Sequence, residues 1–148
     1  DVISIQFALH YFLKNKTSFE NFFNNINQFL NVGGYVFATF LNGNLLHQQF
    51  ENKKEIKFEG SNHKPLFIIQ KKYKNFKNYG SSILVSGKTI GTHEEYLVNT
   101  DFLKEYFEKH GYKFIEDGLF SQFKEFHQMK SGQSYSALNY FIVLQKIK

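Results

Sequence analysis

The 148-residue chain contains no cysteine and no tryptophan, and it has only one proline and one methionine. Without cysteine, the chain can form neither a disulfide framework nor a thiolate metal site. No apolar stretch approaches the roughly 20 residues that a membrane-spanning helix needs, and no signal peptide is recognisable. These absences predict a protein with no membrane partner that works in a reducing, intracellular setting.

The best-known catalytic motifs are also absent. The sequence has no nucleophile elbow, no zinc-binding HExxH pattern and no phosphate-cradling Gly-x-x-x-x-Gly-Lys loop. Its six histidines are scattered singly along the chain, so no metal site is expected. No hydrolase constellation therefore stands out.

Aromatic and basic side chains are what the chain has in quantity. Phe and Tyr raise the aromatic share to 19%, a bias that we attribute to an AT-rich coding sequence, so much of it could serve as core filler. The length suits one domain with a hydrophobic core and is too short for two ordinary ones. The formal net charge of +5 favours a polyanionic partner, but the excess is moderate and spread out, so it supports nucleic acid only weakly.

The first 40 residues predict a strand, a helix and a second strand. The chain opens at Asp1 on an apolar run typical of a central parallel strand. Thr17-Ser-Phe-Glu20 then matches a capping box, and apolar residues follow it at helical spacing. Gly33 and Gly34 should end this helix before a strand at residues 35–40. Such a unit makes the two strands parallel, and a strand at the very start of the chain predicts that the chain opens inside a domain.

The rest of the sequence predicts short strands around one further helix. Residues 42–64 are polar and should form a short helix followed by a loop. Asn99 or Thr100 should cap a second amphipathic helix, which Gly111 closes. Residues 119–130 are ambiguous, with a helix as the nearest match. Strands are expected at residues 82–85, 93–98, 112–115 and 138–146.

Two places in the sequence carry side chains suited to holding a planar, polar ring. The first strand runs into Gln6, Phe7, His10 and Tyr11, and a distant acidic turn carries Glu95. Aromatic rings can cover the faces of such a ligand, a carboxylate can accept from its N–H donors, and a histidine can reach its acceptor edge. Taken singly, Phe7 could be core filler, His10 and Tyr11 could cap backbone groups, and Glu95 could be an exposed turn acid. Their joint occurrence favours a binding site.

These segments resemble the mRNA cap guanine-N7 methyltransferases, most closely the version fused into capping enzymes of large DNA viruses. The resemblance extends over nearly the whole chain. It departs from the family at Val32 and Leu41, where the family usually has proline, and these changes alter loop stiffness more than chemistry. The matching segments are residues 2–11 (VISIQFALHY), residues 30–42 around Gly-Gly-Tyr, residues 95–98 (EYLV) and residues 137–146.

The resemblance implies a chain that binds S-adenosylmethionine, with Gln6 and Tyr11 near this methyl donor. Glu95 would accept from guanine N1–H and the 2-amino group, and His10 would donate to O6. Guanine N7 has an in-plane lone pair and needs no general base, so alignment should supply most of the acceleration and no catalytic acid or base is expected. The residues that the resemblance places around the cap guanine are Phe7, His10, Tyr11, Glu95 and Tyr140, with Tyr135 as a competitor for the last position.

Residues 71–77 interleave lysines with Tyr73 and Phe76. Such a pattern can follow a phosphate backbone and stack bases, although a solvated strand or loop face is the more common explanation. The side chains that could contact RNA phosphates are Lys71, Lys72, Lys74 and Lys77.

The sequence as a whole is interpreted as α/β: a class I S-adenosylmethionine-dependent methyltransferase, Rossmann-like, with a mostly parallel sheet, antiparallel C-terminal strands and an N-terminal truncation. Residues 1–148 would be the carboxyl-terminal portion of one cap methyltransferase domain. The donor's glycine-rich loop would lie upstream, so the chain alone should bind the donor poorly.

The expected function is methyl transfer from S-adenosylmethionine to N7 of the RNA cap guanosine. Two alternatives remain: another class I methyltransferase that acts on a small molecule or a protein, and a catalytically silent RNA-binding or stimulatory partner with the same fold. The expected partner is capped RNA, together with a small stimulatory subunit or fused triphosphatase and guanylyltransferase domains. The expected location is the host cytoplasm or virion for a viral protein and the nucleus for a cellular one.

Overall fold

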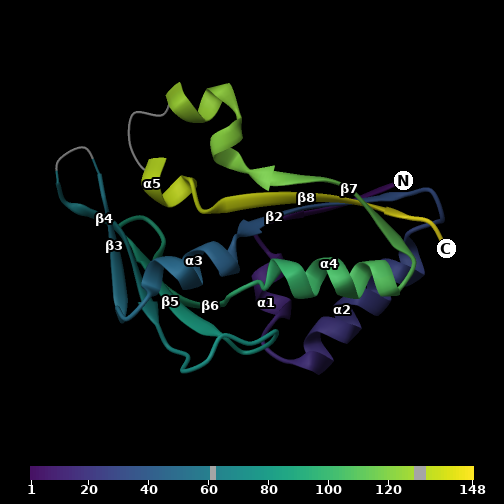
Figure 1. The fold of residues 1–148 in the computed structure, drawn as a ribbon, viewed down its shortest axis with the longest axis horizontal. Helices are drawn as coiled ribbons and strands as arrows, with labels where there is room; N and C mark the ends of the chain where they lie inside the picture. The colour runs from purple at the N-terminus through teal and green to yellow at the C-terminus, as the bar shows by residue number, and fades with distance from the viewer. Residues whose placement is uncertain (61–62, 129–132) are drawn as a thin grey trace.

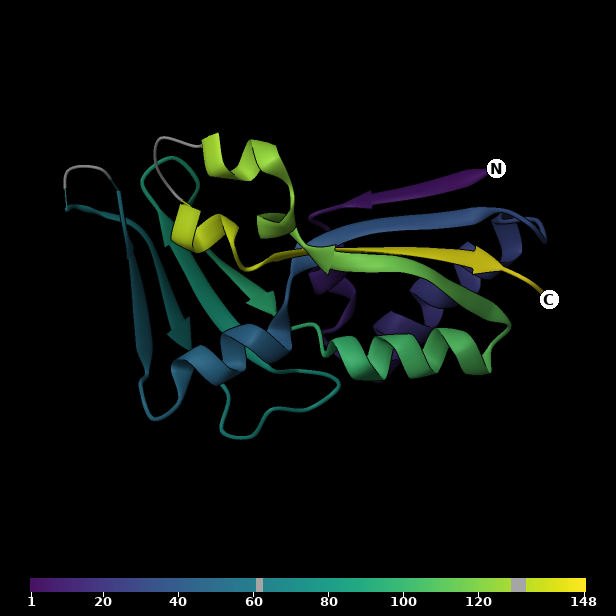
Figure 2. The ribbon, with the colours of Figure 1, turned by 45° about the horizontal axis from the view of Figure 1, so that its top comes forward.

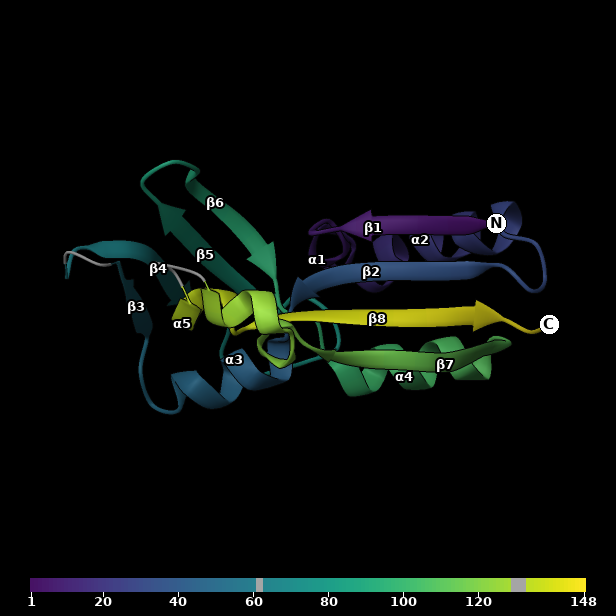
Figure 3. The ribbon, with the colours of Figure 1, turned by 90° about the horizontal axis from the view of Figure 1, so that it is seen from above.

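The structure is a computed structural model that describes residues 1–60, 63–128 and 133–148. Its first sheet has the order β1 (Val2–Gln6), β2 (Tyr35–Leu41), β8 (Asn139–Lys146) and β7 (Tyr112–Leu119), as Figure 3 shows. β1 and β2 are parallel, whereas β8 is antiparallel to both of its neighbours. The α/β class is therefore confirmed, and so are the antiparallel C-terminal strands. The sheet is mixed rather than mostly parallel, since β1–β2 is its one parallel pair among the described strands.

β1 is the first strand of the described sheet and pairs with β2 alone. Val2 is 67% exposed and only Ile5 is fully buried, because helices cover one face of the strand.

Helices α2 (Lys16–Phe29) and α4 (Thr100–Lys109) cover one face of the first sheet (Figure 1). Rings of the two helices meet, with the centroids of Phe23 and Phe107 5.2 Å apart. The cap of α2 lies two residues before the predicted Thr17, because Asn15 accepts from the backbone N–H of Ser18 at 2.8 Å. α4 is capped by Asn99 as predicted. The core between this sheet and its helices includes Phe19, Phe22, Phe23, Ile26, Val36, Ala38, Phe40, Leu103, Phe107, Ile142 and Leu144.

A second sheet follows helix α3 (Gly43–Phe50) and has its own core (Figure 2). It is an antiparallel meander of β3 (Glu55–Glu59), β4 (Pro65–Lys71), β5 (Ser82–Gly87) and β6 (Gly91–Tyr96). The prediction of a loop up to residue 64 is wrong at β3. Phe58 is the one fully buried side chain of that strand, so the sequence carries little apolar signal there. Its core includes Leu41, Leu46, Phe50, Phe58, Ile69, Ile83, Val85, Leu97 and Leu138.

Short helices complete the described chain. α1 (Leu9–Phe12) follows β1, and α5 (Gln133–Ser136) precedes β8. The ambiguous segment 119–130 continues β7 and then forms two 3-10 helices, η1 (Phe120–Gln122) and η2 (Lys124–Gln128). Its last two residues lie outside the described ranges.

The two sheets meet at a backbone contact between the end of β2 and the segment after β6. Asn42 forms an isolated bridge with Val98, and the N–H of Gly43 donates to the Val98 carbonyl at 3.1 Å. Asn44 adds a side-chain link, since its Oδ1 accepts from both the N–H and the hydroxyl of Thr100. This junction places the end of β6 beside the ends of β1 and β2.

Replacing Gly43 with alanine tests the junction. A Cβ there would lie 2.8 Å from the backbone carbon and nitrogen of Val98, and closer still to its carbonyl oxygen. Because backbone atoms cannot move aside cheaply, we expect Gly43→Ala to lower the free energy of unfolding by about 1–3 kcal/mol, measured by urea denaturation. Gly60→Ala is the control, since its Cβ would meet nothing nearer than 3.8 Å. An unchanged urea midpoint for Gly43→Ala would contradict this account of the junction.

Candidate functional site

A cavity of about 370 Å³ opens where the two sheets meet, and we call it the junction cavity. Its volume falls in the range of about 300–1,000 Å³ that is usual for small-molecule sites. It is lined by residues from the end of β1, from α1, from both sheets and from the segment before β8. The lining residues are Phe7, His10, Tyr11, Leu41, Phe67, Ile90, His93, Glu95, Tyr135 and Asn139.

Local backbone geometry turns Phe7, His10 and Tyr11 toward this cavity. Phe7 has a φ of 50°, a left-handed conformation that a bulky residue adopts only under strain. Its N–H donates to the Thr39 carbonyl at 2.9 Å, which holds the strained residue against the end of β2. α1 begins two residues later and places the rings of His10 and Tyr11 4.1 Å apart.

Glu95 is buried at the centre of the polar lining, with a relative exposure of 7%. The Nε2–H of His93 donates to its Oε1 at 2.7 Å, and Nε2 of His10 lies 3.8 Å from the same oxygen. A carboxylate has about four acceptor positions, so one bond from His93 leaves capacity for a ligand. A buried carboxylate with unused acceptor positions is suited to paired N–H donors.

His10 presents an unused polar atom to the cavity. The residue is 7% exposed, and its Nε2 makes no hydrogen bond within the described part of the chain. Burial lowers the pKa of His10 below its ordinary value of 6.5; the negative charge of Glu95 opposes this shift, and the neighbouring His93 adds to it. The imidazole is therefore neutral near pH 7, and a buried polar atom without a partner favours a ligand that supplies one.

Aromatic rings form the apolar part of the lining. Tyr135 stacks on Phe67 with centroids 4.0 Å apart and an interplanar angle of 14°. Phe7 and Tyr11 are half exposed, so their rings border the mouth of the cavity. Burial, together with the charge of Glu95, raises the pKa of Tyr135, so its hydroxyl stays protonated.

Tyr140 is not among the residues that line the junction cavity. Tyr140 is buried on the helix side of β8, where its ring lies 5.7 Å from that of Phe40 and its hydroxyl donates to Asp117. Tyr135, the competitor noted in the sequence, lines the cavity instead.

Gln6 lies beside the junction cavity rather than in it. Its side chain is exposed at the carboxyl end of β1, where its Oε1 accepts from the Thr39 hydroxyl at 2.8 Å and its Nε2 donates to Ser4 at 2.9 Å. The carboxyl ends of parallel strands are where α/β folds bind ligands. The Gln6 side chain is exposed there, whereas Thr39 is buried beneath it.

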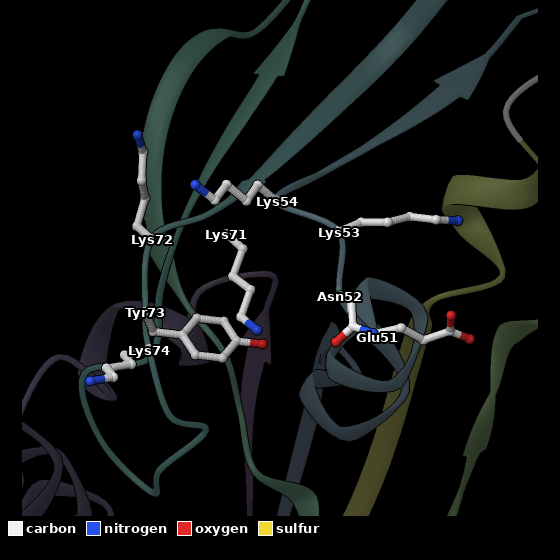
Figure 4. Close-up of a pocket in the computed structure, with 8 residues that line it drawn as sticks. All are labelled: Glu51, Asn52, Lys53, Lys54, Lys71, Lys72, Tyr73 and Lys74. Carbon is white, nitrogen blue, oxygen red and sulfur yellow. The ribbon is translucent and has the colours of Figure 1, made fainter.

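The predicted lysines separate into two groups. Lys71, Lys72 and Lys74 line a second cavity together with Lys53 and Lys54, which the sequence interpretation missed (Figure 4). The Lys53-Lys54 pair is visible in the sequence, but nothing there indicates that it lies beside residue 71. Lys77 is exposed and is not part of that lining.

His93 and Phe67 are the main lining residues of the junction cavity that sequence reasoning missed. The alternation along β6 puts His93 on the same face as Glu95, so the predicted strand contained a usable signal. Phe67 lies in a different strand, and no local pattern links it to this cavity.

Within the described ranges, no group of three or more His, Asp or Glu residues could hold a metal ion. No described helix is both long enough and apolar enough to cross a membrane.

Solved structures of methyltransferases share this fold. An S-adenosylmethionine-dependent methyltransferase from Clostridium acetobutylicum ATCC 824 matches 98% of this chain and 57% of its own length, with a TM-score of 0.58 and 10% identity. The CcbJ methyltransferase from Streptomyces caelestis matches 99% of this chain and 57% of its own, with a TM-score of 0.57 and 13% identity. At such low identity these likenesses show the fold alone, and that fold is the class I methyltransferase fold.

The sequence narrows this class further. The model of the mRNA (guanine-N(7))-methyltransferase domain family matches residues 1–142, and the chain belongs to that family. A relative described as "Probable mRNA-capping enzyme", from Acanthamoeba polyphaga mimivirus, is 33% identical over 131 residues. The match covers 81% of this chain and 11% of the relative, so the chain spans about a tenth of that protein's length. The predicted resemblance is confirmed, and family and fold imply S-adenosylmethionine as the cofactor.

The lowered pKa of His10 predicts a pH-dependent stability. As the pH falls below 6.5, the unfolded chain binds a proton at His10 that the folded chain does not, so the free energy of unfolding falls. At higher pH both states are neutral at this residue, and its stabilising effect is fully present. The wild type should lose unfolding free energy between about pH 7.5 and about pH 5.5, and we expect His10→Gln to lose less of it, as measured by urea denaturation.

The matched control is His63→Gln, because the His63 side chain is 93% exposed. It should leave the pH dependence of the wild type intact. Equal slopes for the wild type and His10→Gln would contradict the burial argument.

Proposed function

We propose that the chain forms the cap-binding part of an mRNA (guanine-N7)-methyltransferase and holds the cap guanine in the junction cavity. The observation that carries the proposal is the buried pair of Glu95 and His10, whose unused polar atoms line one cavity. Membership of the mRNA (guanine-N(7))-methyltransferase domain family supports the same reaction.

The polar groups of the cavity match the edge of guanine. Glu95 would accept from N1–H and the 2-amino group, a pair of donors that adenine cannot present. Neutral His10 would donate from Nε2 to O6, which gives this buried atom the partner that the chain does not supply. Sites that pair with specific polar groups reject analogues lacking them, because the site's own groups are then left unpaired.

Charge also favours this arrangement during the reaction. As N7 forms its bond to the methyl carbon, the guanine ring becomes positively charged. The Glu95 carboxylate stabilises that charge, and a neutral His10 adds no repulsion next to it. His93 would hold the Glu95 carboxylate in place through its 2.7 Å hydrogen bond.

Alignment supplies the rest of the acceleration, because N7 needs no general base. When bound, S-adenosylmethionine would supply an electrophilic methyl group on a sulfonium. Gln6, which the buried Thr39 hydroxyl positions, would hold the polar part of this donor at the strand ends, next to the strained Phe7 that leads into the junction cavity. Phe7, Tyr11 and Tyr135 would fix the guanine plane so that N7 points at the methyl group.

We also propose that residues 1–148 are the carboxyl-terminal portion of one cap methyltransferase domain. Both methyltransferase structures extend beyond this chain, which matches 57% of each. The mimiviral relative supports a place within a longer capping protein that could carry other capping activities. Activity tests therefore belong in the full-length protein. An upstream sequence without a glycine-rich donor loop would instead favour a catalytically silent RNA-binding or stimulatory partner. Methylation of a small molecule or a protein would favour another class I methyltransferase.

Glu95→Ala tests the cap site. We expect cap methylation by the full-length protein to fall by at least about 100-fold, because a charge-assisted hydrogen-bond pair is worth about 3 kcal/mol. The measurement is kcat/KM with a guanosine cap dinucleotide and with its inosine analogue, which lacks the 2-amino group. The wild type should prefer guanosine, and Glu95→Ala should lose most of that preference.

Glu94→Ala is the matched control. Glu94 is the adjacent carboxylate, it is exposed, and its side chain accepts from Ser82 rather than lining the junction cavity. Its removal should change the rate by less than about threefold. A normal rate or an unchanged base preference in Glu95→Ala would remove Glu95 from the cap site.

A further inference from the structure

The second cavity, of about 590 Å³, lies at the far end of β4 from Phe67 of the junction cavity. We call it the lysine cavity. Two chain segments form it: the loop after α3 and the residues that end and follow β4 (Figure 4). Its lining residues are Glu51, Asn52, Lys53, Lys54, Lys71, Lys72, Tyr73 and Lys74.

Backbone hydrogen bonds hold these two segments together. The N–H of Lys71 donates to the Lys54 carbonyl at 2.9 Å, and the N–H of Lys53 donates to the Phe50 carbonyl at 2.6 Å. Lysines that lie far apart in the sequence are therefore brought to one hollow by the fold. The clustering belongs to the tertiary structure and does not follow from a run of basic residues alone.

The lysine cavity concentrates positive charge without compensation. Five of the chain's 18 basic residues line it, against one acid, Glu51. Elsewhere in the described chain, Lys16, Lys57 and Lys104 each form an ion pair with a carboxylate. None of the five cavity lysines forms such a pair with a described residue. Five lysines around one hollow with a single acid make the local potential positive, so this arrangement favours an anionic ligand.

Tyr73 gives the cavity a fixed wall. Its hydroxyl hydrogen-bonds with Nδ1 of His47 at 2.7 Å, and Phe76 stacks on the same His47 ring at 4.7 Å. Nζ of Lys71 lies 4.9 Å from the centre of the Tyr73 ring, a cation–π contact that positions this ammonium group. Burial raises the pKa of Tyr73 to about 12, so its hydroxyl adds no negative charge to the cavity at neutral pH.

We propose that the lysine cavity binds the phosphate backbone of the RNA that follows the cap. This inference rests on the proposed cap methylation, because it assigns the cavity to the same substrate. Phe67 and Lys71 are four residue steps apart along β4, which is about 13 Å at the rise of a strand. About four nucleotides cover that distance at the stacked rise of about 3.4 Å per nucleotide, so RNA of modest length could reach both cavities.

The lining favours RNA over an acidic protein segment. Protein interfaces are depleted in lysine and are built around buried aromatic or aliphatic anchors, whereas this hollow offers one aromatic residue whose hydroxyl is already bonded. The chain has no arginine, so its cations are point charges suited to a backbone of any sequence. Binding here should depend strongly on salt and weakly on base sequence.

The test replaces four cavity lysines in the full-length protein: Lys53→Gln, Lys54→Gln, Lys71→Gln and Lys72→Gln. A charge-matched control replaces exposed lysines of the other sheet and its surroundings: Lys109→Gln, Lys113→Gln, Lys124→Gln and Lys148→Gln. The first measurement is the affinity for an uncapped single-stranded RNA of about 20 nucleotides over a range of salt concentrations. We expect the cavity variant to bind at least about tenfold more weakly at low salt, with a salt slope smaller by about 2 to 3.

The second measurement separates this inference from the proposed function. In the cavity variant, KM for capped RNA should rise by about tenfold while kcat/KM for a cap dinucleotide stays within about twofold of wild type. If the wild type methylates neither substrate, the proposed function fails, and the uncapped RNA still tests the cavity. Melting curves would show that both variants are folded.

Three results would overturn the inference. The first is an unchanged RNA affinity in the cavity variant. The second is an equal loss in the control variant, which would mean that net charge alone governs binding. The third is a cavity-dependent binding of polyglutamate that RNA does not displace, which would assign the surface to an acidic protein partner.

Discussion

The close approach of Gly43 to Val98 determines where the rest of the site lies. The two sheets have separate cores, and a backbone-to-backbone contact joins the end of β2 to the segment after β6. Glu95 lies three residues before Val98, and Phe7 is bonded to Thr39, three residues before Asn42. This backbone contact, reinforced by the Asn44 link to Thr100, therefore helps to set the distance between Glu95 of the second sheet and the aromatic and imidazole groups of the first. Any side chain at position 43 would change that separation.

The polar groups that this contact brings together are not fully satisfied by the chain. Glu95 is buried with one clear hydrogen bond, from His93, and His10 Nε2 has none among the described residues. Buried groups without partners destabilise the folded state, so evolution normally removes them unless a ligand uses them. A ligand that pairs with both groups would bind the folded chain and stabilise it by mass action. The strained backbone of Phe7, at the edge of the same cavity, fits the same explanation.

Sequence reasoning succeeded where the signal was local. α2 and α4 have strong helical periodicity, so their existence was predictable, although the first turn of α2 was not, because Asn15 caps the helix ahead of Thr17. β3 was missed because one buried Phe58 leaves no pattern. The resemblance named Glu95 and His10 as site residues. It could not show that Tyr135 lines the junction cavity while Tyr140 packs in the first core, because β8 has apolar residues on both faces. Long-range neighbours such as His93 and His10, or Lys54 and Lys71, depend on strand pairing and packing, so no local rule predicts them.

The two cavities suggest how one chain could select a base without selecting an RNA sequence. In the functions proposed above, the junction cavity is small and lined by oriented groups, so its energy depends on the identity of the ring that enters. The lysine cavity is larger, and its cations are flexible point charges, so its energy depends on phosphate number and on salt. Arginine in the lysine cavity would add directional, bidentate contacts and stacking on bases, and it would therefore introduce sequence preferences. A chain that has no arginine and places its uncompensated lysines away from Glu95 would, under the proposed functions, keep the two kinds of recognition physically separate, so the strength of RNA binding would change without altering the choice of guanine.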